Sequence, residues 1–154
     1  MSDTLTFEGR LEWQGQPAGQ PFGYETAARD TRLDFDGGAV LEGSAPAPFF
    51  GDGSKPNPET LMMASLMQCH FLTFLAVVAK SRLEILSYAD QASGTLGKRD
   101  GGKMSFTEVV LRPRVKLAAP IDAERYAALH AKAHANCFMA NSVNFEVRVE
   151  PVLE

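Results

Sequence analysis

Residues 57–80 form a long, predominantly apolar stretch that constrains the fold of this chain more than any other segment. The stretch opens with Asn57, which is suited to cap a helix, and Pro58, which suits the first helical position. Glu59 follows in the first turn, where a negative charge interacts favourably with the helix dipole. Residues with helical spacing then form one stripe: Leu61, Met62, Ser65, Leu66, Cys69, Leu72 and Ala76. The pattern predicts a single long helix that ends near Lys80.

The chain before this helix predicts extended structure. Residues 4–13 place apolar side chains at alternating positions, and residues 31–43 carry two apolar pairs on either side of an Asp-Gly-Gly turn. These patterns are typical of a meander of strands. Residues 45–58 are too rich in proline and glycine for regular structure, so we expect an ordered loop with Phe49 and Phe50 exposed in it.

The chain after the helix predicts a hairpin, a second helix and a final strand. Two strand patterns within residues 87–117 flank an Asp-Gly-Gly turn at 100–102. Asp122 is suited to cap a helix that ends near Asn136, and residues 142–152 close the chain as a strand. Because the alternating strand-helix-strand rhythm of parallel folds is absent, the order of elements predicts an α+β fold with antiparallel sheets and two main helices.

Composition and charge exclude several classes of protein. A chain of 154 residues with 45% hydrophobic and 22% charged residues is typical of a single soluble domain, here residues 1–154. A net charge of −4 argues against nucleic-acid binding, and the basic run 112–116 alternates with apolar residues like the solvated face of a strand. The apolar run 71–79 is about half of the roughly 20 residues that span a membrane, and the N-terminus does not have the pattern of a secretory signal. We therefore expect a cytoplasmic protein that does not insert into membranes.

The chain contains two cysteines, Cys69 and Cys137, and the residues alone leave their chemistry open. A permanent disulfide is uncommon in the cytoplasm, which leaves buried thiols, metal ligands or redox chemistry. Cys69 shares the apolar stripe of the long helix, as an inert core thiol would. A zinc site would combine both cysteines with His70 and His134, although neighbouring helical residues point about 100° apart. A cysteine hydrolase would use His130 or His134 as its base, but the glycines of a nucleophile elbow do not flank either cysteine.

A redox pair requires the fewest coincidences. One thiolate attacks an electrophile, and a second thiol resolves the product as a disulfide. An ordinary thiol, with a pKa of about 8.5, is only slightly ionised at neutral pH, so a reactive cysteine needs a neighbouring cation. Lowering the pKa of a thiol by two units requires about 2.7 kcal/mol of thiolate stabilisation, which one partly buried arginine could supply.

Four stretches of sequence together resemble a known family. They are AARD at 27–30, LEGSAPAPFFGDGSKPNP at 41–58, NPETLMMASLMQCH at 57–70 and CFMANSV at 137–143. From about Phe22 onward the chain resembles the OsmC/Ohr family, which comprises osmotically inducible protein C and the organic hydroperoxide resistance proteins. Ohr-type members usually carry Cys-Pro where this chain has Cys137 followed by Phe138, so the chain resembles the less characterised OsmC-like branch.

The resemblance implies roles for four residues. Cys69 matches the peroxidatic cysteine, and Cys137 matches the resolving cysteine that closes a disulfide with it. Glu59 matches the glutamate that holds an arginine against the reactive sulfur, and Arg29 is the match to that arginine, with Arg32 as the alternative. The resemblance also implies an intertwined homodimer, organic hydroperoxides as substrates, an external dithiol as reductant, and no metal or organic cofactor.

Given the role that the resemblance assigns to Glu59, helix geometry also favours a dimer. Ten residues at about 1.5 Å each separate Glu59 from Cys69 by about 15 Å along one straight helix. Unless the helix breaks between them, Glu59 serves the thiol of another protomer, as in a symmetric dimer.

The sequence therefore predicts a cysteine-based peroxidase, and the alternative is a non-enzymatic stress or ligand-binding protein of the same fold. An apolar pocket that favours organic peroxides is expected from Leu61, Met62, Met63, Met67, Phe49 and Phe50.

Overall fold

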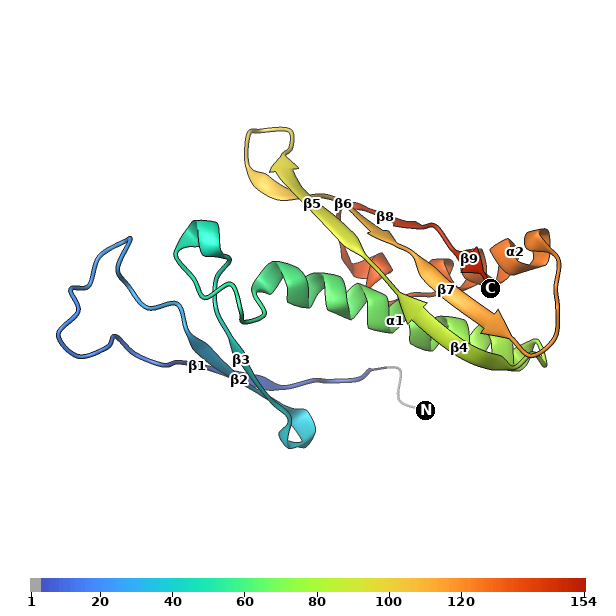
Figure 1. Ribbon diagram of the computed structural model, residues 1–154, viewed down its shortest axis with the longest axis horizontal. Helices are drawn as coiled ribbons and strands as arrows, with labels where there is room; N and C mark the ends of the chain where they lie inside the picture. The colour runs from blue at the N-terminus through green and yellow to red at the C-terminus, as the bar shows by residue number, and fades with distance from the viewer. Residues whose placement is uncertain (1–3) are drawn as a thin grey trace. The chain divides into compact units, whose positions relative to one another are not determined.

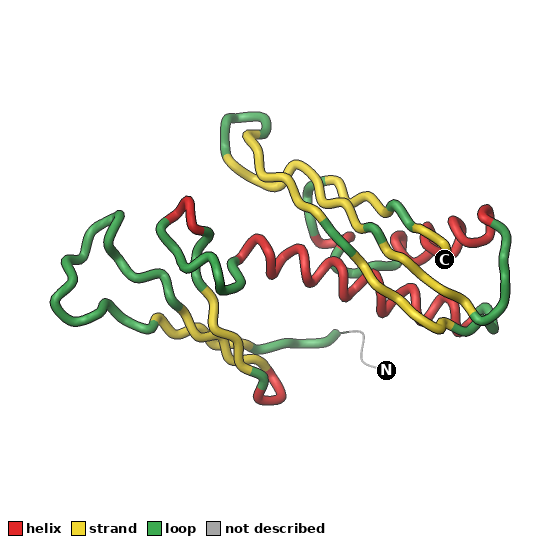
Figure 2. Tube along the Cα trace, in the orientation of Figure 1, coloured by secondary structure: helices red, strands yellow, loops and turns green. Residues whose placement is uncertain are grey.

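The computed structural model of the protein describes residues 4–154 (Figures 1 and 2). The chain divides between Leu61 and Met62 into two compact units. The N-terminal unit is built on an antiparallel sheet with the strand order β1-β2-β3. Its strands are β1 (Gly9–Trp13), β2 (Thr31–Phe35) and β3 (Val40–Gly43). The predicted meander is therefore confirmed.

Two short 3-10 turns follow the strands of this sheet. The first, η1 (Asp36–Gly38), connects β2 to β3 at the expected Asp-Gly-Gly sequence. Gly37 and Gly38 have φ values of 82° and 87°, a conformation that glycine adopts without a steric penalty. The second, η2 (Ala47–Phe49), lies in the loop rich in proline and glycine, in which Phe49 and its neighbour are exposed as expected.

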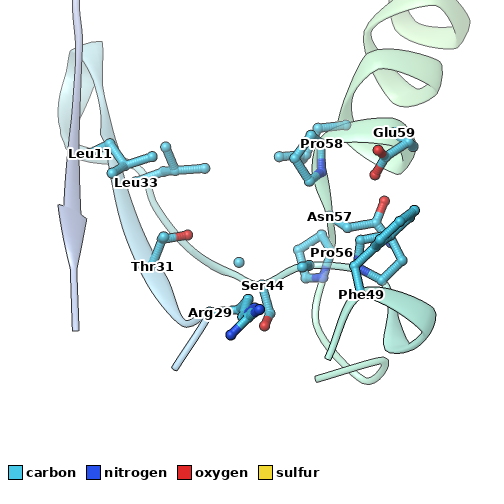
Figure 3. A pocket seen from close by; sticks show the side chains of 14 residues that line it. Leu11, Arg29, Thr31, Leu33, Ser44, Phe49, Pro56, Asn57, Pro58 and Glu59 are labelled. Carbon is cyan, nitrogen blue, oxygen red and sulfur yellow. The ribbon is translucent and has the colours of Figure 1, made fainter. Parts of the chain in front are cut away.

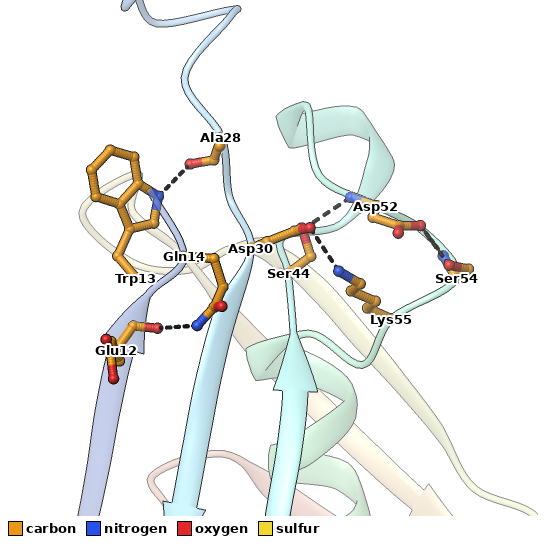
Figure 4. A network of polar contacts seen from close by, with 9 residues as sticks. All are labelled: Glu12, Trp13, Gln14, Ala28, Asp30, Ser44, Asp52, Ser54 and Lys55. Carbon is orange, nitrogen blue, oxygen red and sulfur yellow. Dashed lines mark hydrogen bonds and ion pairs between the residues drawn. The ribbon is translucent and has the colours of Figure 1, made fainter. Parts of the chain in front are cut away.

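A polar network fixes this loop to the segment that carries Arg29 (Figure 4). Asp30 forms an ion pair with Lys55 at 2.6 Å. The hydrogen bond from Lys55, followed by one from Ser44, lowers the pKa of Asp30. Ser44 Oγ in turn accepts a hydrogen bond from the main-chain N of Asp52 at 3.0 Å. The loop is therefore ordered by side chains, although it has little regular structure of its own.

Helix α1 (Pro58–Lys80) is continuous over 23 residues, as predicted. Asn57 caps it, because its side-chain oxygen accepts a hydrogen bond from the main-chain N of Thr60 at 2.9 Å. Thr60 Oγ1 accepts in return from the main-chain N of Asn57 at 3.0 Å. The local sequence therefore determines where the helix begins, and no break separates Glu59 from Cys69.

The buried face of α1 differs from the predicted stripe. Its buried residues are Leu66, His70, Phe74, Val77 and Val78. Leu72 and Ala76, which the stripe placed in the core, are exposed. Leu72 is 54% exposed, Leu75 42% and Met62 38%, so α1 carries an exposed apolar face. The prediction was wrong because α1 is apolar on most sides, and the packing of the sheets selects the core face.

The C-terminal unit contains two three-stranded sheets. One sheet has the order β4-β7-β9 and consists of β4 (Ile85–Asp90), β7 (Pro113–Leu117) and β9 (Val152–Leu153). The other has the order β5-β6-β8 and consists of β5 (Ser93–Lys98), β6 (Met104–Leu111) and β8 (Glu146–Val149). The predicted hairpin is β5–β6, whose turn places Gly101 and Gly102 at positive φ. In β7, Arg114 and Lys116 are exposed and alternate with buried residues, as expected for a solvated strand face.

Helix α2 (Ala123–Ala135) returns the chain to the sheets. Asp122 caps it by accepting a hydrogen bond from the main-chain N of Arg125 at 2.7 Å, as predicted. After α2 and the short turn η3 (Ala140–Ser142), β8 pairs parallel to β6, and β9 pairs parallel to β7. The predicted α+β class with two main helices is confirmed, and the sheets are antiparallel except at these two strands, because a crossover through a helix permits parallel pairing.

Two apolar clusters hold α1 against the sheets. In the first, Phe74 and Val78 of α1 pack with Val115 of β7 and Leu129 of α2. Figure 1 shows the second half of α1 running alongside β4 and β7. In the second, the core residues are Leu66, Val109, Leu111 and Val147. The two halves of α1 therefore pack against different sheets.

By length and composition α1 could also cross a membrane. Its mean hydropathy is 1.8 over the most apolar window. The core helix of a soluble protein meets the same criteria, so this property alone does not define a membrane protein.

Candidate redox site

Cys69 and Cys137 come together in the C-terminal unit from two different elements. Cys69 lies in the middle of α1 and Cys137 follows α2, yet the two side chains form a hydrogen bond. Both are free thiols. Cys137 is 1% exposed, whereas Cys69 is half-buried and therefore the more accessible of the two. The structure thus places together the two sulfur atoms that the sequence assigned to one reaction.

The turn after α2 directs main-chain N–H groups at both sulfur atoms. The turn is closed by the main-chain N of Asn141, which donates to the carbonyl oxygen of Cys137 at 3.0 Å. The main-chain N of Met139 donates to Cys69 Sγ at 3.4 Å, and that of Ala140 donates to Cys137 Sγ at 3.5 Å. A hydrogen bond to sulfur favours the ionised form of a thiol, so this turn can stabilise either thiolate.

Burial raises the pKa of the Cys137 thiol to about 11, and its hydrogen bond to Cys69 acts in the same direction. The N–H group of Ala140 opposes this shift but is outweighed by burial. Cys137 is therefore protonated at neutral pH and carries an S–H group beside the sulfur of Cys69.

Arg29 and Glu59 line a pocket of about 540 Å³ in the N-terminal unit. Figure 3 shows them on opposite sides of the pocket, Arg29 beside Ser44 and Glu59 at the start of α1. The apolar part of the wall is formed by Leu11, Leu33, Pro46, Phe49, Pro58 and Leu61. Phe49 and Leu61 line the pocket as predicted, whereas Met63 and Met67 belong to the second apolar cluster of the C-terminal unit.

Arg29 is held on the side of the pocket away from Glu59. Its guanidinium donates to the main-chain oxygens of Tyr24 and Ala27 and lies 5.7 and 5.6 Å from the ring centres of Tyr24 and Phe50. Glu59 Oε2 is buried and has no hydrogen-bond partner among the described residues. Within one protomer, Arg29 and Glu59 thus share a pocket without contacting each other.

Arg32, the alternative cation, has a different setting. It extends from β2, pairs with Asp34 at 2.9 Å and does not line the pocket. Of the two arginines, Arg29 therefore lines this pocket and Arg32 does not.

The three histidines lie on α1 and α2 in the C-terminal unit. His70 Nε2 and His130 Nδ1 are 3.0 Å apart, and both rings are buried and stacked with Phe74. Within residues 4–154, no group of three or more His, Cys, Asp or Glu side chains is arranged to hold a metal ion. Within these residues the ligands of the zinc site that the sequence left open are therefore not brought together, and His70 packs in the core. Sequence analysis missed its pairing with His130.

The structure defines an α+β protein that brings two free thiols together. The chain belongs to the OsmC family, because the family model of OsmC-like proteins matches residues 51–152.

Two solved structures and one curated protein illustrate this relationship. An OsmC-like protein of unknown function from Vibrio cholerae is 35% identical, with a TM-score of 0.88 over 97% of this chain and 100% of that one. An organic hydroperoxide resistance protein from Elizabethkingia anophelis shares the fold at 18% identity, with a TM-score of 0.73 over 100% of this chain and 99% of that one. The uncharacterized protein YmaD of Bacillus subtilis is 23% identical over 119 residues, which are 74% of this chain and 79% of that protein.

Proposed function

We propose that the protein is a peroxidase that reduces organic hydroperoxides, with Cys69 as the attacking thiolate and Cys137 as the resolving thiol. The contact between these two free thiols is the observation that carries the proposal. Attack on the peroxide leaves Cys69 as a sulfenic acid, and Cys137 condenses with it to a disulfide. An external dithiol restores both thiols, in keeping with a reducing cytoplasm.

We infer that the working unit is a homodimer. Because α1 is continuous, Glu59 and Cys69 of one helix are separated by about 15 Å along its axis. The exposed apolar face with Met62, Leu72 and Leu75 supplies a surface for self-association. In the assembled site, Arg29 and Glu59 of one protomer stabilise the thiolate of Cys69 in the other.

The substrate class follows from the pocket that contains Arg29. Its mainly apolar wall suits the organic part of an alkyl or aryl hydroperoxide better than hydrogen peroxide. A relative that shares the fold is named an organic hydroperoxide resistance protein, which supports the same class.

Intact mass and thiol titration test the reaction. One equivalent of cumene hydroperoxide should remove two thiols together in the wild type and add no oxygen, because an internal disulfide forms. The Cys137→Ser variant should instead gain one oxygen or more at Cys69. Two thiols that persist after the peroxide has been added would refute the peroxidase and favour a non-enzymatic binding protein.

The arginine and the dimer are tested by matched variants. Arg29→Gln should slow the oxidation of Cys69 at neutral pH and much less in alkali, where the thiolate forms without help. Arg32→Gln is the control and should leave the rate unchanged. When Arg29→Gln dimers are mixed with Cys69→Ser dimers under conditions in which subunits exchange, activity should be restored. Each hybrid dimer then contains one complete site, with Arg29 from one subunit and Cys69 from the other. If activity is not restored, the sites are not shared between subunits.

A further inference from the structure

Reduction of a hydroperoxide consumes a proton at a defined step. When a thiolate attacks an alkyl hydroperoxide, the O–O bond breaks and an alkoxide leaves. Its conjugate acid is about as weak an acid as water, with a pKa of about 15.7. The alkoxide therefore needs a proton as it departs, and a positioned acid group accelerates such steps by about 10² to 10⁴.

Few groups at the proposed site can supply this proton. Arginine stays protonated in proteins, so Arg29 can bind charge but cannot release a proton. Glu59, in the role proposed above, is engaged with the guanidinium of Arg29 rather than with the leaving oxygen. The N–H group of Met139 contacts Cys69 Sγ but does not ionise. The remaining group against that sulfur is the thiol of Cys137.

We propose that Cys137 is the general acid of the first half-reaction and that the same proton transfer creates the thiolate that resolves Cys69. The proposal rests on the peroxidase function above and assigns Cys137 a step before disulfide formation. Cys137 then acts twice, first through its proton and then through its sulfur.

The two steps balance in atoms and electrons. In the first, Cys69 S⁻ attacks the terminal oxygen of ROOH, an S–O bond forms and the O–O bond breaks. The alkoxide takes the proton of Cys137, which gives ROH, the sulfenic acid of Cys69 and the thiolate of Cys137. In the second, that thiolate attacks Cys69 Sγ, the S–O bond breaks, and a disulfide and hydroxide form. Cys69 sulfur loses two electrons in the first step, and the peroxide gains them.

The surroundings of Cys137 suit both roles. Its side chain is 1% exposed, which limits competition from bulk water as the proton donor. A thiol with a pKa of about 11 keeps its proton at neutral pH. It is still a stronger acid than an alcohol, so transfer of its proton to an alkoxide lowers the free energy. Once the proton has gone, the Ala140 N–H group, 3.5 Å from Cys137 Sγ, stabilises the new thiolate until it attacks.

The test compares two oxidants whose leaving groups differ in their need for a proton. tert-Butyl hydroperoxide releases an alkoxide, whereas peracetic acid releases a carboxylate, whose conjugate acid has a pKa similar to that of Glu, about 4.3. Single-turnover oxidation of Cys69 is measured in the full-length wild type and in the variants Cys137→Ala and Cys137→Ser. The reaction is quenched and the intact mass of the protein is then determined. Each rate is divided by the rate of Cys69 alkylation with iodoacetamide, which reports the fraction of reactive thiolate.

Cys137→Ala should lower the normalised rate with tert-butyl hydroperoxide by about 10²-fold and leave the rate with peracetic acid nearly unchanged. Cys137→Ser should behave similarly, because a hydroxyl is a much weaker acid than a thiol. Equal losses with both oxidants, or no loss with either, would overturn the general-acid role while the peroxidase stands. If Cys69 of the wild type reacts with neither oxidant, the peroxidase itself fails.

Discussion

Acidification should destabilise this fold through the buried pair His70 and His130. Both side chains are almost fully inaccessible, at 0% and 2% exposure, and their nearest ring nitrogens are 3.0 Å apart. Burial is the main cause that lowers the pKa of His70 to about 4 and that of His130 to about 3. Smaller contributions come from the charge of His134 on His70 and from that of His70 on His130.

The sign and size of the effect follow from linkage. An unfolded histidine binds a proton below a pKa of about 6.5, whereas the folded pair stays neutral until pH 4 or below. Between these limits the unfolded state binds more protons, so the free energy of unfolding decreases as pH falls. The slope approaches about 1.4 kcal/mol per pH unit for each histidine well below pH 6.5, and integration gives a loss of roughly 4 kcal/mol for the pair between pH 7.5 and 5.

Urea unfolding at pH 7.5 and pH 5 measures this loss. The variant His70→Gln should show about half the loss of the wild type, because one titrating ring is gone and the amide can still bond to His130. In the folded wild type, the NMR ring signals of both histidines should stay unshifted down to pH 5. Equal pH sensitivity in wild type and variant, or ring signals that titrate near pH 6.5, would refute the reasoning.

Two further predictions concern stability alone. Leu66→Ala should cost about 3 to 5 kcal/mol in urea unfolding, because Leu66 is fully buried at the contact of α1 with β6; a loss below 1 kcal/mol would contradict its place in the core. Gly51→Ala should lower the thermal midpoint clearly, because an added Cβ would lie 1.9 Å from the backbone oxygen of Ala45. Gly53→Ala is the matched control, since its Cβ would meet Ala47 at an ordinary 3.6 Å, and equal midpoints would refute the predicted clash.

The features that the sequence predicted correctly are those set by neighbouring residues. Asn57 and Asp122 cap their helices through hydrogen bonds to N–H groups three residues away, so a few letters suffice to locate them. The Asp-Gly-Gly turns are equally local, because they need glycine at positive φ. Local chemistry therefore located the beginnings of both helices and the turns of both hairpins.

The features that the sequence did not predict depend on contacts between distant parts of the chain. The core face of α1 was misassigned because leucine and methionine occur all around the helix, and only packing decides that Phe74 is buried while Leu72 is not. The parallel pairing of β8 with β6 joins segments separated by α2, and no short pattern marks it. The pairing of His70 with His130 spans 60 positions and left no signal beyond two histidines in helical segments.

In the proposed site, too, some features could be predicted from the sequence and others could not. Cys69 and Cys137 could be singled out because thiols are rare in the chain and their surroundings resemble a family. Arg29 could be named from a short stretch, but its separation from Glu59 within the protomer required coordinates. The N–H group of Met139 could not be predicted, because every residue except proline carries such a donor.

That main-chain donor has an evolutionary consequence. A hydrogen bond from a peptide N–H persists through almost any change of side chain, so selection on it constrains the path of the backbone and leaves the residue type free. Phe138, the residue after Cys137 in this turn, has a side chain that is 77% exposed. Divergence at this position can therefore alter what approaches the sulfur atoms from outside without removing the groups that hold them.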